Sequence, residues 1–96
     1  MTPMAHQVLY IADERTTRMP ADAFRVRLEQ SRFPVKSQRA DGDEVELEID
    51  GGVTLWLFVE GGYVVEVEGE ITFANDRRSN LLLELLESMG FLPVEA

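Results

Sequence analysis

The sequence predicts a mixed α+β domain, a two-layer sandwich in which two helices pack on an antiparallel β-meander in the order β-α-β-β-β-β-α. Three observations predict it. Glycine pairs and an Asp-Gly turn divide residues 35–73, the segments between them have the apolar patterns of strands, and segments of helical periodicity lie before and after. A chain of 96 residues is long enough for one hydrophobic core and too short for two, so we expect a single domain over residues 1–96.

The first expected elements are a short strand and a helix. Residues 8–12, with the sequence VLYIA, predict a buried strand. Pro20 suits the first turn of a helix, in which Phe24 and Leu28 lie one turn apart and face the core. Pro34 ends this helix, because the residue before a proline disfavours the α conformation.

The meander is expected to contain four strands with distinct patterns. The second and fourth alternate between apolar residues and glutamates, as half-exposed strands do. The third is apolar on both sides from Thr54 to Val59, the pattern of a strand covered on both faces. The first is polar, and its Lys36 and Arg39 suit an exposed edge. The four strands are expected near Val35–Ala40, Glu44–Asp50, Val53–Glu60 and Tyr63–Thr72.

A second helix is expected from Asp76 to Met89, with Asn75 as its N-cap and Gly90 at its C′ position. Its core stripe comprises Leu82, Leu85, Leu86 and Met89, and Leu81 and Leu83 widen it. An apolar tail at residues 91–94 follows, and it is available to fold back over the domain.

Two registers of the hairpins are open, and they place Trp56 on opposite faces. With two-residue loops, Trp56 faces the same way as the apolar residues of the neighbouring strands, and the leucines on either side of it lie among the glutamates. With three-residue loops, at residues 50–52 and 60–62, the side chains of the third strand alone exchange faces, and Trp56 and Phe58 lie among the glutamates. We favour the second register because it leaves fewer apolar side chains among the acids.

In either register, one face of the sheet carries two glutamate columns on the two sides of a central apolar stripe. This pattern resembles a binding hot spot with a polar border. The candidate partner-binding residues are Trp56 and Phe58 as anchors, with Glu46, Glu48, Glu66, Glu68 and Glu70 as an electrostatic rim.

Something is expected to cover this stripe, because leaving Trp56 and Phe58 in water forgoes roughly 1.5–3 kcal/mol each. Three covers are open: a helix or the tail of the same chain, a second copy in a symmetric dimer, or a separate partner with a basic rim and an apolar centre. In the dimer the glutamate columns approach each other, unless arginines pair across the interface. The arginines considered for this pairing are Arg25, Arg27, Arg77 and Arg78.

The charges are distributed unevenly along the chain. Residues 1–39 contain seven bases and four acids and carry +3, whereas residues 40–96 contain two bases and fourteen acids and carry −12. The acidic half suits a basic partner or serves solubility, and it opposes direct binding of nucleic acid.

Residues that support catalysis or metal binding are sparse. The chain has no cysteine, which excludes thiolate chemistry and favours a reducing compartment, and His6 is the single histidine. The turn at residues 41–44 holds three carboxylates without the spacing of a calcium loop. Glu46, paired across the strands with Glu66 or Glu68, is the basis of a remote enzymatic alternative.

These observations predict a small, acidic, non-catalytic protein-binding module with an adaptor or regulatory role in the cytoplasm. We expect no cofactor, no metal, no direct nucleic-acid contact and no membrane contact, since no segment approaches the ~20 apolar residues of a membrane span. The alternative is a homo-oligomeric structural domain without an external ligand. A carboxylate-based enzyme is the remote alternative.

Overall fold

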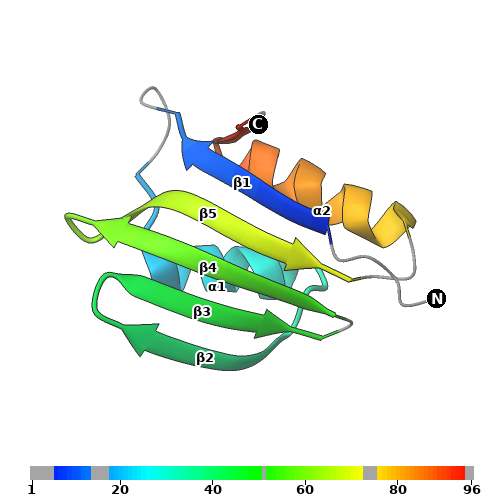
Figure 1. Ribbon diagram of the computed structural model, residues 1–96, viewed down its shortest axis with the longest axis horizontal. Coiled ribbons are helices and arrows are strands. Elements are labelled where there is room, and N and C mark those ends of the chain that lie inside the picture. Colours follow the sequence, from blue (N-terminus) through cyan, green and yellow to red (C-terminus); the bar gives the residue numbers. More distant parts are fainter. Residues whose placement is uncertain (1–5, 14–17, 51, 73–75, 95–96) are drawn as a thin grey trace.

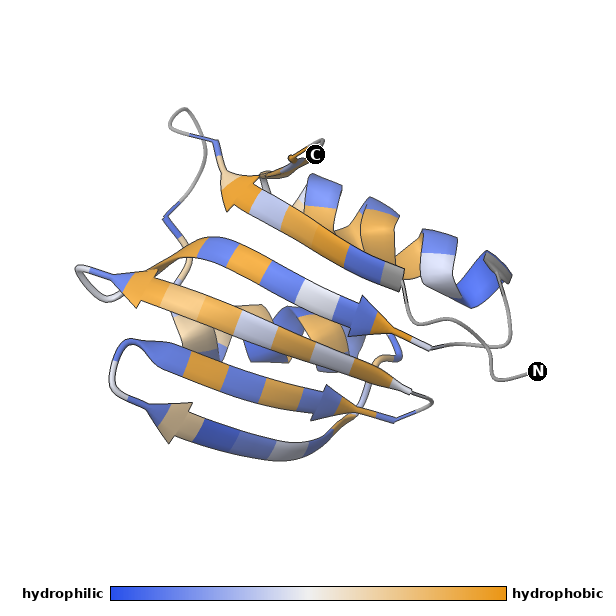
Figure 2. Ribbon diagram, in the orientation of Figure 1, coloured by the Kyte–Doolittle hydropathy of each residue, from blue (hydrophilic) through white to orange (hydrophobic). Residues whose placement is uncertain are grey.

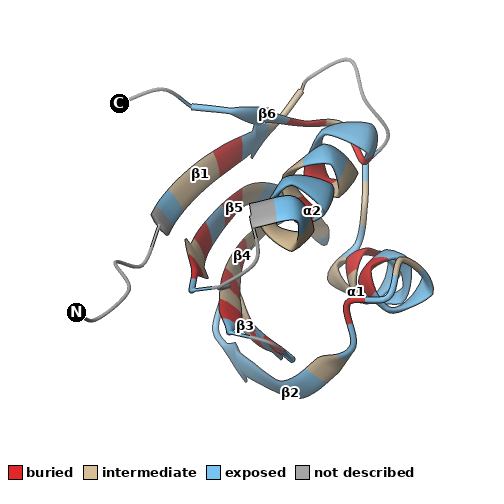
Figure 3. Cartoon of the chain, turned by 90° about the vertical axis from the view of Figure 1, so that its right-hand side faces the viewer, coloured by how far each residue is buried: buried red, intermediate tan, exposed pale blue. Residues whose placement is uncertain are grey.

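The structure, a computed structural model, describes residues 6–13, 18–50, 52–72 and 76–94. Two helices and six strands follow one another in the order β1-α1-β2-β3-β4-β5-α2-β6. The strands form one antiparallel sheet with the spatial order β2-β3-β4-β5-β1-β6. Both helices lie on the same face of this sheet (Figures 1 and 3). The predicted α+β class and the antiparallel meander are therefore confirmed.

The four meander strands lie where the sequence predicts them, to within one residue at each end. They are β2 (Val35–Asp41), β3 (Glu44–Ile49), β4 (Val53–Glu60) and β5 (Tyr63–Ile71). Figure 2 shows the alternation of apolar and polar residues along β3 and β5. As predicted, β2 is an edge strand, and its residues are exposed except for the half-buried Val35.

Beyond β5, towards the edge opposite β2, the sheet contains one strand more than the sequence predicts. β1 (His6–Ala12) pairs with β5, and β6 (Phe91–Pro93) pairs with β1 at the outer edge. The apolar tail is therefore the sixth strand, and a run of three residues is too short to show a strand pattern. Its Phe91 is buried and meets Phe24 edge to face, with 5.6 Å between the ring centroids.

α1 (Ala21–Gln30) begins directly after Pro20 and buries Phe24 and Leu28 completely, as predicted. The helix ends at Gln30, before the position that Pro34 restricts, so the expectation that Pro34 ends it is wrong. The end instead has a Schellman geometry. The Phe33 N–H donates to the Leu28 carbonyl at 2.9 Å, and the Arg32 N–H donates to the Glu29 carbonyl at 3.2 Å. Arg32 consequently adopts a left-handed conformation, with φ at 67°.

α2 (Asp76–Ser88) buries Leu82 and Leu86, and Met89 directly after it is also buried. Gly90 has φ at 95°, as expected for a C′ residue, whereas the expected N-cap Asn75 lies outside the described residues. The expectation that Leu81 widens the core stripe is wrong, because this side chain is 50% exposed. Leu83 is half-buried and packs against the core, as does Leu85.

The core lies between the helices and the sheet. Residues of the sheet that face the helices include Tyr10, Leu47, Leu55, Leu57 and Val67, all almost fully buried. Gly69 interrupts this apolar series because it lies between Val8 and Leu55, where a Cβ atom would come within 2.9 Å and 3.0 Å of their side chains.

Replacing Arg32 by glycine is expected to stabilise the protein. A non-glycine residue in the left-handed region costs about 1–2 kcal/mol, and the greater freedom of glycine in the unfolded chain offsets part of the gain. Arg32→Gly should therefore raise the free energy of unfolding by about 0.5–1 kcal/mol in urea denaturation. The matched control, Arg27→Gly inside α1, should lower it by about 1 kcal/mol. Equal effects of the two changes would contradict the capping geometry.

Tyr10 is expected to make the stability sensitive to alkaline pH. Burial, with a further contribution from the negative charge of Glu87, raises the pKa of the Tyr10 phenol above 10.0. The resulting stabilisation is fully present below about pH 10, the ordinary pKa of tyrosine. It is lost as the pH rises from there through the folded-state pKa, because in that range the phenol ionises in the unfolded state and stays neutral in the folded state. Between about pH 8 and about pH 11, the wild type should lose more unfolding free energy than Tyr10→Phe. Parallel losses in the two proteins would refute this assignment.

Candidate functional site

The pairing of β4 places its aromatic residues between glutamates. Trp56 pairs with Glu46 on β3 and Glu68 on β5, and Phe58 pairs with Glu44 and Glu66 in the same way. Leu55 and Leu57, on the opposite side of the strand, are fully buried beneath the helices. The favoured register is therefore confirmed for Trp56 and Phe58.

The two hairpins reach this register by different routes. Three residues separate the paired Ile49 and Val53, as predicted, but only two separate Glu60 and Tyr63. The predicted three-residue loop at residues 60–62 is therefore wrong. A shift between Phe58 and Val59 restores the parity by leaving one extra residue, Val65, on β5.

The bulge also changes which valine of β5 faces the core. Alternation with the glutamates of β5 predicts that Val65 points inward, but Val65 is 37% exposed, whereas its neighbour Val64 is buried. A strict alternation of side chains would have required the reverse. In a regular strand, residues two apart face the same side. Because of the bulge, the buried Val64 and the outward-facing Glu66 instead face opposite sides.

We call the face of the sheet opposite the helices the open face. Both helices lie on the other side, so none of the described residues forms a layer over Trp56 and Phe58 (Figure 3). Phe91, from the tail, is buried against Phe24 of α1, so it too lies on the helix side. Of the three covers left open by the sequence, a helix or the tail of the same chain is therefore excluded for the described residues. Trp56 and Phe58 remain half-buried between the glutamates.

Six glutamates form two parallel rows on the open face. The rows contain Glu44, Glu46 and Glu48 on β3, and Glu66, Glu68 and Glu70 on β5. Since neighbouring strands lie about 4.8 Å apart, the rows are about 10 Å apart, with β4 between them. Within the described residues, none of the six forms an ion pair, and Glu48 accepts a hydrogen bond from Ser37 at 3.1 Å. All five glutamates predicted as the rim therefore lie on this face, together with Glu44.

At the β2 edge of the sheet, a basic residue adjoins the open face. Arg39 pairs with Glu46 in the β2–β3 ladder. A shallow hollow of about 220 Å³ lies beside this pair, and it is lined by Arg39, Asp41, Glu44, Glu46 and Trp56. One side of the indole is thus reachable from solvent.

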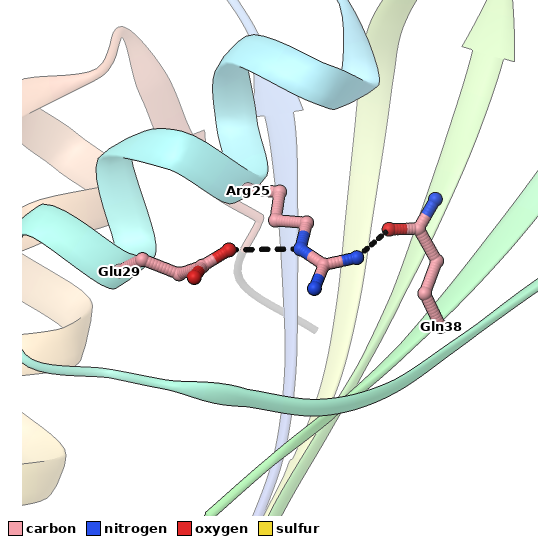
Figure 4. A network of polar contacts seen from close by, with 3 residues as sticks. All are labelled: Arg25, Glu29 and Gln38. Carbon is pink, nitrogen blue, oxygen red and sulfur yellow. Dashed lines mark hydrogen bonds and ion pairs between the residues drawn. The ribbon is translucent and has the colours of Figure 1, made fainter.

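The arginines proposed for pairing across a dimer lie on the helix side. Arg25 of α1 contacts Glu29 at 2.8 Å and donates to the Gln38 side chain at 2.7 Å, which ties α1 to β2 (Figure 4). Arg27 is exposed on α1, and Arg77 and Arg78 belong to α2. None of the four is placed on the open face.

The open face also carries a second apolar stripe that the sequence analysis missed. Leu9 and Ile11 of β1 pair with Glu68 and Glu66, and Leu92 of β6 pairs with Ile11. The Val94 N–H donates to the Leu9 carbonyl at 2.8 Å, which extends the stripe. Ile11 is 44% exposed, Leu92 48% and Val94 40%. The continuous apolar run at residues 8–12 was the available signal, because a strand that is apolar on both sides cannot bury both beneath one layer of helices.

The remaining candidates do not form a site within the described residues. His6 begins β1 opposite Ile71, and its side chain lies outside the described part. No group of three His, Cys, Asp or Glu side chains able to hold a metal ion occurs among the described residues, the turn at residues 41–44 included. No helix in the described ranges is long and apolar enough to cross a membrane. Comparison of the chain with protein-family models, curated proteins and solved structures finds no match.

The two sides of β4 should respond differently to truncation. Leu57→Ala leaves a cavity in the core and should lower the free energy of unfolding by about 2–5 kcal/mol. Trp56→Thr removes a larger side chain that is only half-buried and should cost less than about 2 kcal/mol. Urea unfolding followed by circular dichroism measures both changes. A greater loss for Trp56→Thr would mean that this side chain belongs to the core.

Proposed function

We propose that this domain is a small, acidic, non-catalytic protein-binding module with an adaptor or regulatory role. Its ligand is a basic segment of another protein, and the open face is its binding surface. The observation that carries the proposal is the position of Trp56 and Phe58, half-buried between two rows of glutamates and uncovered by the described chain.

The chemistry of this face supports a partner with an apolar centre and basic flanks. A partner that completes the burial of Trp56 removes its remaining exposed apolar surface from water, which adds a favourable hydrophobic term to binding. Aromatic anchors of this kind dominate many interfaces. The glutamate rows attract lysine and arginine and exclude acidic competitors. The same rows repel phosphate, so the ligand is a protein rather than a nucleic acid.

Self-association, the alternative considered from the sequence, fits the face less well. A two-fold axis that stacks two open faces over β4 brings the rows on β3 and β5 of one copy onto those of the other. Like charges then meet across the interface, and such contacts cost several kcal/mol. Since Arg25, Arg27, Arg77 and Arg78 belong to the helix side, they do not neutralise these rows.

Binding is also favoured over catalysis by the arrangement of the carboxylates. Glu46 and Glu68 lie about 10 Å apart at the level of their strands, and Trp56 occupies the space between them. An acid pair that cleaves a glycosidic bond instead flanks a substrate site. The proposed site needs no cofactor and no metal, and the absence of cysteine suits action in the cytoplasm.

A panel of short peptides tests the proposed function. The peptides share one composition of leucine and lysine in three orders (helical, alternating and scrambled), and a fourth replaces every lysine by glutamate. At least one basic peptide should bind in calorimetry, and the acidic peptide should not. Trp56→Ala should weaken binding by about 30-fold, as expected for an anchor worth about 2 kcal/mol.

Charge-reversal variants provide the matched control for this experiment. Glu46→Lys with Glu68→Lys changes the net charge from −9 to −5, and Glu84→Lys with Glu87→Lys on α2 makes the same change on the helix side. Only the first pair should abolish binding. Equal weakening by both pairs, or a stable wild-type dimer that Trp56→Ala dissociates, would overturn the proposal.

A further inference from the structure

We infer that the partner presents a pair of adjacent helices, one lying over β4 and the other over the stripe formed by β1 and β6. This inference rests on the proposed function and specifies its ligand. It depends on two features of the open face: the absence of unpaired backbone groups at its centre, and the spacing of its two apolar stripes.

A helix is favoured at β4 because this strand is central in the sheet. Its backbone is paired with β3 on one side and β5 on the other, and the edges of the sheet are β2 and β6. The centre of the open face therefore offers side chains and no backbone partners. An extended peptide lying there would leave its own N–H and C=O groups without protein partners, whereas a helix satisfies them internally.

The width of the acidic rim also fits a helix. The two glutamate rows are about 10 Å apart, and a helix with its side chains is about 10–12 Å across. A helix whose apolar stripe rests on Trp56 and Phe58 thus places the residues flanking that stripe above the two rows. Lysine and arginine at those positions cover the apolar surface with their stems and reach the carboxylates with their charged ends.

The second stripe lies at the distance of a second helix. β5 and its row Glu66, Glu68 and Glu70 separate β4 from β1, so the two stripes are about 10 Å apart. Adjacent packed helices have axes 8–10 Å apart. The row on β5 then lies beneath the junction of the two helices and receives basic side chains from both. The opposite face already holds two helices, so the sheet is wide enough for a pair (Figures 1 and 3).

The second stripe is distinguished from scattered apolar exposure by its grouping. Ile11 and Leu92 are paired neighbours, and Val94 is joined to Leu9 by a backbone hydrogen bond. Val26 and Leu81 are both 50% exposed, but they lie on α1 and α2. They therefore serve as control positions.

The test compares a single helix with a helical hairpin. The probes are the helical leucine–lysine peptide of about 14 residues, about 21 Å long, and two copies of it joined by a glycine-containing turn. Calorimetry should show that the hairpin binds the wild type at least about 10-fold more tightly than the single helix, as expected when both stripes are engaged. The alternating peptide should bind at least about 10-fold more weakly than the helical one.

Variants assign the advantage of the hairpin to the second stripe. Ile11→Ser with Leu92→Ser should remove the advantage while leaving single-helix binding unchanged, and Val26→Ser with Leu81→Ser should preserve it. If the first variant fails to fold by circular dichroism, Leu92→Ser with Val94→Ser, confined to the edge and the end of the described chain, replaces it.

The possible results separate this inference from the proposed function. A single helix that binds through Trp56, together with a hairpin that binds no more tightly, overturns the paired-helix inference and leaves the proposed function standing. Preferred binding of the alternating peptide overturns the helical part alone. Failure of every basic peptide to bind overturns both.

Discussion

Trp56 pairs with Glu46 on one side and Glu68 on the other, and the rest of the sheet depends on this register. Because side chains alternate along a strand, it places Leu55 and Leu57 beneath the helices at the same time as it places Trp56 and Phe58 among the acids. A shift of one residue would bury the tryptophan and expose the leucines. The three-residue loop before β4 and the bulge at Val65 after it act together to hold the observed parity.

This register places the acidic residues of the sheet and the basic residues of the helices on opposite faces of the sheet. The glutamates of β3 and β5 project from one face, while the arginines of α1 and α2 belong to the other side of the sheet. The two acidic rows are about 10 Å apart, close to the screening length at physiological ionic strength, so their mutual repulsion is tolerable in the free protein. The same rows disfavour stacking of two copies, and in the function proposed above they attract a basic ligand.

Much of the fold and of the candidate face was predictable because it depends on local patterns. Turn chemistry and alternation located β2 to β5 to within one residue, and the five rim glutamates and both aromatic anchors lie together as predicted. The left-handed Arg32 and the bulge at Val65 escaped prediction. In both cases a residue without a special local preference takes an unusual position because the surrounding contacts require it.

The sequence by itself determined the α+β class, the meander and the composition of the acidic and aromatic face, because these follow from the spacing of residues within single elements. Only the tertiary structure decided that both helices lie on one side of the sheet and that residues 91–93 form a sixth strand beside β1. It also decided that Ile11, Leu92 and Val94 extend the apolar surface of the open face. These features join segments far apart in the chain, about 80 residues for β1 and β6, and no pattern within one element specifies which distant element will lie beside it.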